Sequence, residues 1–193
     1  RLSAQESSIP GDNVMRFYRL AIPVTSSSYE QDLNADYSRV KLFWQECEEY
    51  LNNIYVPLGF CFDVIEDERL VLHESNLIDE NVYNAPSLGT ELLNDLISSA
   101  SYDIGMWVTH RDDYEENSGL SIENGAYLNS TKASGYAKTD KWVVAHEIGH
   151  LLGANHTPPG EGSLMDQIGG YLSYLSIKRI RTACVERNAA YYA

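Results

Sequence analysis

Short segments in which apolar residues alternate with polar ones, or run together, indicate strands along the first part of the chain. Four such segments are predicted as strands: Phe17–Thr25, Phe60–Ile65, Tyr102–Thr109 and Ala133–Ala137. The third is almost continuously apolar, which favours a central position in a sheet with both faces covered. Between the last two, segments 119–122 and 125–128 flank Glu123-Asn124, a pattern typical of a hairpin.

Helical spacing of apolar residues predicts the remaining elements. From Asp36 to Tyr55 they recur every three or four positions, which predicts a long amphipathic helix against the sheet. These residues are Val40, Phe43, Trp44, Cys47, Leu51 and Ile54. Three more helices are predicted: Thr90–Ser98, a helix from Thr139 or Asp140 to Leu152, and Leu172–Asn188. Residues 1–14, 66–89 and 111–118 are predicted as irregular segments or loops.

The composition indicates one domain with an ordinary core. The chain has 193 residues, of which 44% are hydrophobic. A net charge of −14 argues against nucleic acid and anionic membrane surfaces as partners, and is typical of a solvated acidic surface. No apolar run approaches the roughly 20 residues that span a bilayer. The first residues lack the features of a signal peptide, so we expect a mature or trimmed form.

The segment HEIGHLLGANH, from His146 to His156, points to a specific chemistry. On a helix, His146 and His150 lie one turn apart on one face, where two imidazoles can hold one zinc ion. Gly153 permits a turn with positive φ, so that His156 can return as a third ligand. Three nitrogen ligands leave a fourth position for water, which is typical of catalytic zinc. Glu147 can reach the open side of the metal.

This pattern is too specific for an ordinary amphipathic helix. HExxHxxGxxH fixes five positions, and with roughly one-in-twenty usage at each, a chance match in such a chain has odds of about one in ten thousand. The chain has five histidines, and three lie in this segment. A plain helix explains neither Glu147 beside the first histidine nor Gly153 before the third.

Met165 follows soon after, and with the zinc motif it resembles the metzincin clan of zinc endopeptidases, where a Met-turn lies under the metal. The segments FYRLAIPVT, YLNNIYVPLGFCFDVI and WVVAHEIGHLLGANH are most similar to reprolysin-like (adamalysin-type) members, in a bacterial form. The resemblance implies an α/β (α+β) fold: a twisted, mixed five-stranded sheet with two backing helices, an active-site helix and a C-terminal helix. Within one catalytic domain, we expect an upper subdomain at 15–153 and a lower one at 154–193.

The resemblance also implies a zinc-dependent endopeptidase. A zinc-activated water would attack the peptide bond, with Glu147 as the general base that later protonates the leaving amine. An edge strand near Leu120 and Ser121 is expected to hold an extended peptide by main-chain hydrogen bonds. Ile168 and Tyr171 are expected in the wall of a hydrophobic S1′ pocket. We expect protein or peptide substrates, a monomer, and secretion or cell-surface location in a bacterium.

Two positions depart from the subfamily patterns. Adamalysins usually carry Asp where this chain has Thr157, and astacins and serralysins carry a tyrosine where it has Gln167, so no tyrosine ligand is indicated. The cysteines also limit the comparison, because there are only three: Cys47, Cys61 and Cys184. One disulfide plus one thiol, or three buried thiols, both fit this odd number.

Two other functions fit the zinc motif. One is a zinc-holding binding module with weak or no catalysis, against which Glu147 argues, since a degenerate site tends to lose its base first. The other is a zinc amidase acting on a non-protein amide. Cleavage of protein substrates separates both from an endopeptidase.

Overall fold

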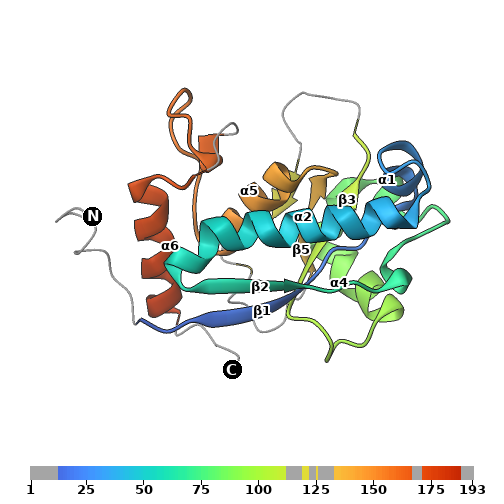
Figure 1. Cartoon of the computed structure of the whole chain (residues 1–193), viewed down its shortest axis with the longest axis horizontal. Coiled ribbons are helices and arrows are strands. Elements are labelled where there is room, and N and C mark those ends of the chain that lie inside the picture. Colours follow the sequence, from blue (N-terminus) through green and yellow to red (C-terminus); the bar gives the residue numbers. More distant parts are fainter. Residues whose placement is uncertain (1–12, 112–118, 122–124, 126–132, 167–170, 188–193) are drawn as a thin grey trace.

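The computed structural model describes residues 13–111, 119–121, 125, 133–166 and 171–187, and one mixed sheet organises them (Figure 1). The strand order is β2-β1-β3-β5-β4. All neighbours are parallel except β4, which is antiparallel to β5. The mixed five-stranded sheet expected from the sequence is therefore confirmed. Its strands are β1 (Arg16–Ala21), β2 (Phe60–Val64), β3 (Ile104–Thr109), β4 (Gly119–Ser121) and β5 (Ala133–Lys138).

One face of the sheet is covered by the long helix α2 (Tyr37–Tyr55), as its apolar spacing predicted. Trp44 is fully buried and donates from Nε1 to the carbonyl of Ile22 at 3.0 Å. At the end of the helix, the ring of Tyr55 meets Phe62 of β2 edge-on, with centroids 5.8 Å apart. The apolar side of α2 therefore closes the core over the first strands.

The second predicted helix, α4 (Ala85–Leu96), lies against the other face. Trp107 of β3 is buried and donates from Nε1 to the Gly89 carbonyl of α4 at 3.2 Å. Side chains point alternately to the two faces along a strand, so Ile104, three positions before Trp107, faces the opposite side, toward α2. Ile104 pairs with Leu20 of β1. Both helices expected against the sheet are present, and they cover opposite faces.

The prediction of a loop over residues 66–89 was wrong for most of that segment. It contains the short helices η3 (Glu68–Leu70), α3 (Leu77–Glu80) and η4 (Val82–Asn84), and α4 begins within it. Side chains of Asp67, Asn76 and Asn81 cap these turns by accepting backbone amides. Helices of three or four residues are too short to produce a periodic apolar pattern. The polar capping residues therefore gave this segment the composition of a loop.

The first strand also ends earlier than predicted. β1 stops at Ala21, and Val24 makes only isolated bridges to Val71 and Val108. Thr25 then caps helix α1 (Ser26–Gln31), which the sequence analysis did not predict. Pro23 lies between these elements and has no amide to donate to a strand ladder, which accounts for the interruption.

Side chains of α2 occupy the outer edge of β2. Asn52 donates from Nδ2 to the Phe62 carbonyl at 2.8 Å and accepts from the Phe62 amide at 2.7 Å. The amide of Val64 donates to Glu48 Oε2 at 2.7 Å. A free strand edge is a template for pairing with another chain, and these bonds block it. β4 forms the opposite edge of the sheet.

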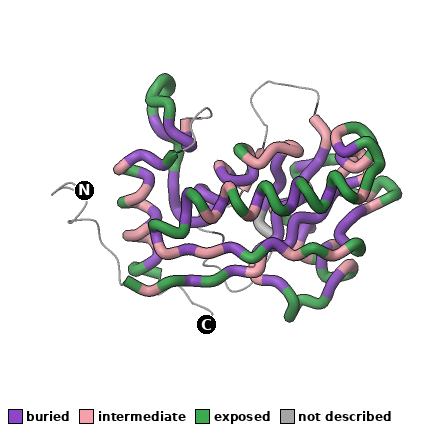
Figure 2. The backbone as a smooth tube through the Cα atoms, in the orientation of Figure 1, coloured by how far each residue is buried: buried purple, intermediate pink, exposed green. Residues whose placement is uncertain are grey.

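The helix that carries the zinc motif, α5 (Lys141–Leu151), begins where Asp140 accepts a hydrogen bond from the amide of Trp142. It packs beside α2, where the Tyr55 hydroxyl donates to the Ala145 carbonyl at 2.6 Å. Figure 2 shows α2 alternating between buried and exposed positions, whereas most residues of α5 are buried. The motif therefore lies on a helix held within the core.

The chain after α5 forms η6 (Leu164–Asp166) and the C-terminal helix α6 (Tyr174–Glu186), which was predicted. Arg181 of α6 donates to the Leu58 carbonyl at 3.0 Å, which connects this helix to the turn after α2. None of the described helices is long and apolar enough to cross a membrane.

The cysteines, all within the described residues, are thiols rather than a disulfide pair. Cys47 and Cys184 are buried and Cys61 is half-buried. Burial raises the pKa of the Cys47 thiol far above its ordinary value, so this side chain is an inert part of the core. Of the two alternatives left open by the sequence, the structure has the three thiols.

Candidate metal centre

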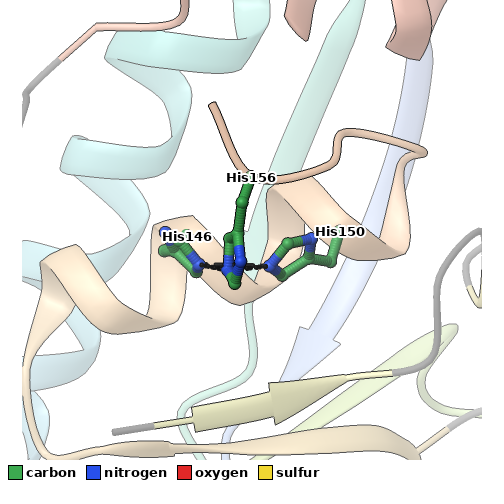
Figure 3. Close-up of side chains that lie close together, drawn as sticks. All are labelled: His146, His150 and His156. Atoms are coloured by element: carbon green, nitrogen blue, oxygen red, sulfur yellow. Dashed lines mark hydrogen bonds between the residues drawn. The ribbon is translucent and has the colours of Figure 1, made fainter. Parts of the chain in front are cut away.

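Three imidazole nitrogens converge on one point beside α5 (Figure 3). The Nε2 atoms of His146 and His150 are 3.1 Å apart, and each lies 3.2 Å from Nε2 of His156. His146 and His150 come from successive turns of α5, whereas His156 approaches from the segment after it. The structure therefore brings together the three histidines that the sequence singled out.

Two carbonyls fix the protonation of the first two rings. Nδ1 of His146 lies 2.8 Å from the Leu164 carbonyl, and Nδ1 of His150 lies 2.7 Å from the Ala154 carbonyl. A carbonyl oxygen only accepts, so each Nδ1 must carry the proton, and in a neutral ring Nε2 then presents a lone pair. Two lone pairs that face each other at 3.1 Å repel, and a cation between them removes this repulsion.

The size of the triangle fits zinc. With Zn–N bonds of about 2.0–2.1 Å and tetrahedral angles, two ligand nitrogens are separated by about 3.3 Å. The observed separations of 3.1 to 3.2 Å are close to one face of such a tetrahedron. Imidazole is a ligand that suits zinc, and carbonyl partners on Nδ1 are the usual support for a ligating ring. The donor set and its geometry therefore fit a zinc ion.

Burial keeps His146 in the neutral form that a ligand needs. Burial, together with the charges of His150 and His156, lowers the pKa of His146 to about 4, while the bond to Leu164 acts in the opposite direction. The ring thus remains neutral through the physiological range, ready to offer Nε2 to a metal.

A tight turn at Gly153 returns the chain to the site. Gly153 has a φ of 108°, a conformation that only glycine adopts without strain. The amide of Gly153 donates to the His150 carbonyl and the amide of Ala154 donates to the Gly149 carbonyl, each at 2.9 Å, and these bonds end α5. The same turn supplies the Ala154 carbonyl to His150 and directs the chain toward His156.

Glu147 follows His146 on α5 and is buried, with only 4% of its surface exposed. Its Oε2 accepts a hydrogen bond from the Ser121 hydroxyl at 2.6 Å. Burial raises the pKa of Glu147 to about 7, although the bond from Ser121 acts to lower it. A carboxylate that titrates near neutral pH is suited to take up and release a proton.

Met165 lies under α5, fully buried in η6. A Cβ on Gly149 would lie 2.7 Å from Met165 Sδ and 3.0 Å from the Tyr55 hydroxyl, so the helix can approach this closely only with glycine there. The Thr157 amide donates to the Met165 carbonyl at 3.2 Å. Met165 is thus packed between the zinc-motif helix and the chain that carries the third histidine.

Thr157, where the chain departs from the adamalysin pattern, connects two parts of the site. It is buried, and its hydroxyl lies 2.8 Å from that of Ser163. Ser163 in turn donates to Glu161 at 3.1 Å. Through these bonds, the residue after His156 is held to the segment that leads into Met165.

The residues predicted to bind substrate are found in different places. Leu120 is 39% exposed on β4, whereas the Ser121 hydroxyl points to Glu147. Tyr171 is exposed, and its hydroxyl donates to the Glu161 carbonyl at 3.4 Å. Ile168 and Gln167 lie outside the described residues. Of these residues, Ser121 is therefore the one that the structure brings into contact with the zinc-motif helix.

Several residues that shape the site were missed by sequence reasoning. The carbonyls of Leu164 and Ala154 orient two rings, but a backbone group leaves no trace in a sequence pattern. Gly119 and Gly149 are required by close approach, and Tyr55 reaches α5 from a helix 90 positions away. Of these features, only the glycines can be noticed in the sequence, and the sequence does not show which contact requires a glycine at each position.

This mixed sheet, with a helix that carries two histidines and a glycine turn that returns a third, has the fold of a metzincin-type metallopeptidase. A model of the reprolysin-like metallo-peptidase family M12B matches residues 50–157, more than half of the chain. The chain belongs to this family. The match includes all three histidines and Glu147, and it ends before Met165.

A solved structure gives the same architecture. A chain from a structure described as "Structure of a chaperone-substrate complex" superimposes with a TM-score of 0.60 and 15% sequence identity. The match covers 86% of this chain but only 30% of that one. At this identity, the likeness supports the fold alone.

Proposed function

We propose that this protein is a zinc-dependent endopeptidase, with His146, His150 and His156 as the metal ligands and Glu147 as the general base. The observation that carries the proposal is the triangle of Nε2 atoms, 3.1 to 3.2 Å on each side, together with the buried glutamate that directly follows His146 on the same helix. Membership in a metallopeptidase family supports hydrolysis of peptide bonds as the reaction.

When bound, zinc would act as a Lewis acid that acidifies water and polarises the scissile carbonyl. Glu147 takes the proton from the attacking water and later delivers it to the leaving amine. Burial favours both steps, because a carboxyl group with a pKa of about 7 exchanges protons readily near neutral pH. Gly153 positions His156, and Met165 supports α5 from below.

We further propose that β4 receives the substrate as an added strand. It is an edge strand of three described residues, and Leu120 projects from it with 39% of its surface exposed. Tyr171, exposed beyond Met165, and Ile168 would border the pocket for the residue after the cleaved bond. We also propose that residues 15–153 form an upper subdomain and residues 154–193 a lower one, with this channel between them. A monomeric state, secretion and a bacterial source remain predictions.

Zinc content and cleavage of casein, measured on the same samples, test the proposal. Glu147→Ala is expected to keep one zinc per chain while cleavage falls by about 10²–10⁴-fold, the usual contribution of a general base. Glu186→Ala, at an exposed position of α6, is the matched control and should cleave normally. A chelator should abolish cleavage by the unaltered chain.

Other results would favour the alternatives. An unaltered chain that holds zinc but cleaves no protein would indicate a binding module. Hydrolysis of small non-peptide amides without cleavage of casein would indicate an amidase. If cleavage occurs, the products of a peptide library should show whether a hydrophobic residue is preferred after the cleaved bond.

A further inference from the structure

Two residues of β4 lie directly against the carboxylate of Glu147. Gly119 and Ser121 are two positions apart, so they face the same side of the strand. The Ser121 hydroxyl lies 2.6 Å from Glu147 Oε2 and 3.1 Å from the Glu147 carbonyl oxygen. A Cβ on Gly119 would lie 2.6 Å from Oε1 and 2.7 Å from Cγ, which is closer than real Cβ contacts. The strand thus approaches Glu147 with a hydroxyl at one position and with no side chain at the other.

The Ser121 contact fixes the carboxylate rather than merely joining two elements. The terminal torsion of a glutamate is broad, so packing alone does not select one orientation of its two oxygens. A hydroxyl has one proton to donate, and both nearby acceptors belong to residue 147, with the carboxylate oxygen much the closer. Within the described part of the chain, Oε2 has this partner and Oε1 has no hydrogen-bond partner.

We propose that Ser121 is a positioning residue for the general base: its hydroxyl holds Oε2 of Glu147, and Gly119 leaves the room that Oε1 needs to accept the proton from water. This inference rests on the proposed function, and it changes the expectation for Ser121. The main chain of this residue can still bind substrate, but its side chain acts on Glu147.

Steady-state kinetics of the zinc-loaded protein distinguish the two roles. In Ser121→Ala, kcat is expected to fall about tenfold, the effect of losing one hydrogen bond to a charged group, while KM and zinc content stay unchanged. Ser121→Thr keeps the hydroxyl and should retain kcat within about threefold. Gly119→Ala should lower kcat further than Ser121→Ala, because the new methyl group displaces the carboxylate itself.

Ser28→Ala is the matched control. Ser28 is buried, and its hydroxyl lies 2.7 Å from that of Thr139, so the variant also loses a hydroxyl contact but none to Glu147. Its kcat should be unchanged. A Ser121→Ala protein with normal kcat overturns the inference, and so does one with raised KM and normal kcat, since that pattern belongs to substrate binding.

A second readout does not depend on catalysis. In chelator-treated protein, Ser121→Ala is expected to lower the urea midpoint when Glu147 is present and to have no effect in a Glu147→Ala background. Equal shifts in both backgrounds would mean that the contact is absent, which overturns the inference. If the zinc-loaded unaltered chain cleaves no peptide, the proposed function itself is wrong. If that chain cleaves peptides and Ser121→Ala has a normal kcat, only the positioning role of Ser121 is overturned.

Discussion

The buried carboxylate of Glu147 should destabilise the metal-free protein at neutral pH, and replacing it with glutamine should stabilise that form. Glu147 is 4% exposed, and burial raises its pKa from the ordinary 4.5 to about 7. An acid with a raised pKa favours the folded state while it is protonated. That contribution is complete below about pH 4.5 and is lost as the pH rises through about 7.

The two pKa values give the magnitude. They differ by about 2.5, and each pKa unit corresponds to about 1.36 kcal/mol, so the ionised group costs about 3 kcal/mol of folding free energy above pH 7. In Glu147→Gln the side chain keeps its shape and can still accept the bond from Ser121, but it cannot ionise. The variant should therefore match the unaltered chain at pH 4 and exceed its stability by about 3 kcal/mol at pH 8.

Urea unfolding of chelator-treated protein, followed by tryptophan fluorescence at several pH values, measures this difference. Trp44 and Trp107 are fully buried and report loss of the core. Taking the difference between variant and parent cancels the histidines and other groups that titrate in both. A glutamine variant that is no more stable at pH 8, or one whose advantage does not grow between pH 4 and pH 8, would refute the reasoning.

Three further predictions concern other parts of the molecule. His156→Ala should lose zinc at a chelator concentration that the parent tolerates, because only two nitrogens remain; unchanged zinc retention would exclude His156 as a ligand. Gly149→Ala should lower the free energy of unfolding by about 1–3 kcal/mol through overpacking against Met165, measured in urea, and an unaffected midpoint would show that this contact yields easily. Asn52→Ala should lower the free energy of unfolding by about 1–2 kcal/mol and raise the dimer content measured by light scattering, because it uncovers the edge of β2. Asn53→Ala, at the exposed neighbouring position, should change neither quantity. Equal behaviour of the two variants would mean that the edge of β2 needs no cover.

Local patterns predicted the long elements well. α2 follows from the spacing of its buried residues, and the buried central strand β3 follows from its continuous apolar run. The short helices between β2 and α4 were not predicted, because three or four residues are too few to show a helical period of apolar positions. The early end of β1 before Pro23 was not predicted, because the residues on both sides of this proline are apolar and read as one continuous strand.

The sequence alone determined which side chains form the candidate metal centre, since two histidines one helical turn apart, a glycine turn and a third histidine are encoded within eleven consecutive residues. The tertiary structure decided what surrounds them. Ser121 reaches Glu147 across 26 positions only because β4 lies antiparallel beside β5. Likewise, Leu164 orients His146 only because the chain returns under α5. Such contacts depend on how distant segments pack, and no spacing along the chain records them.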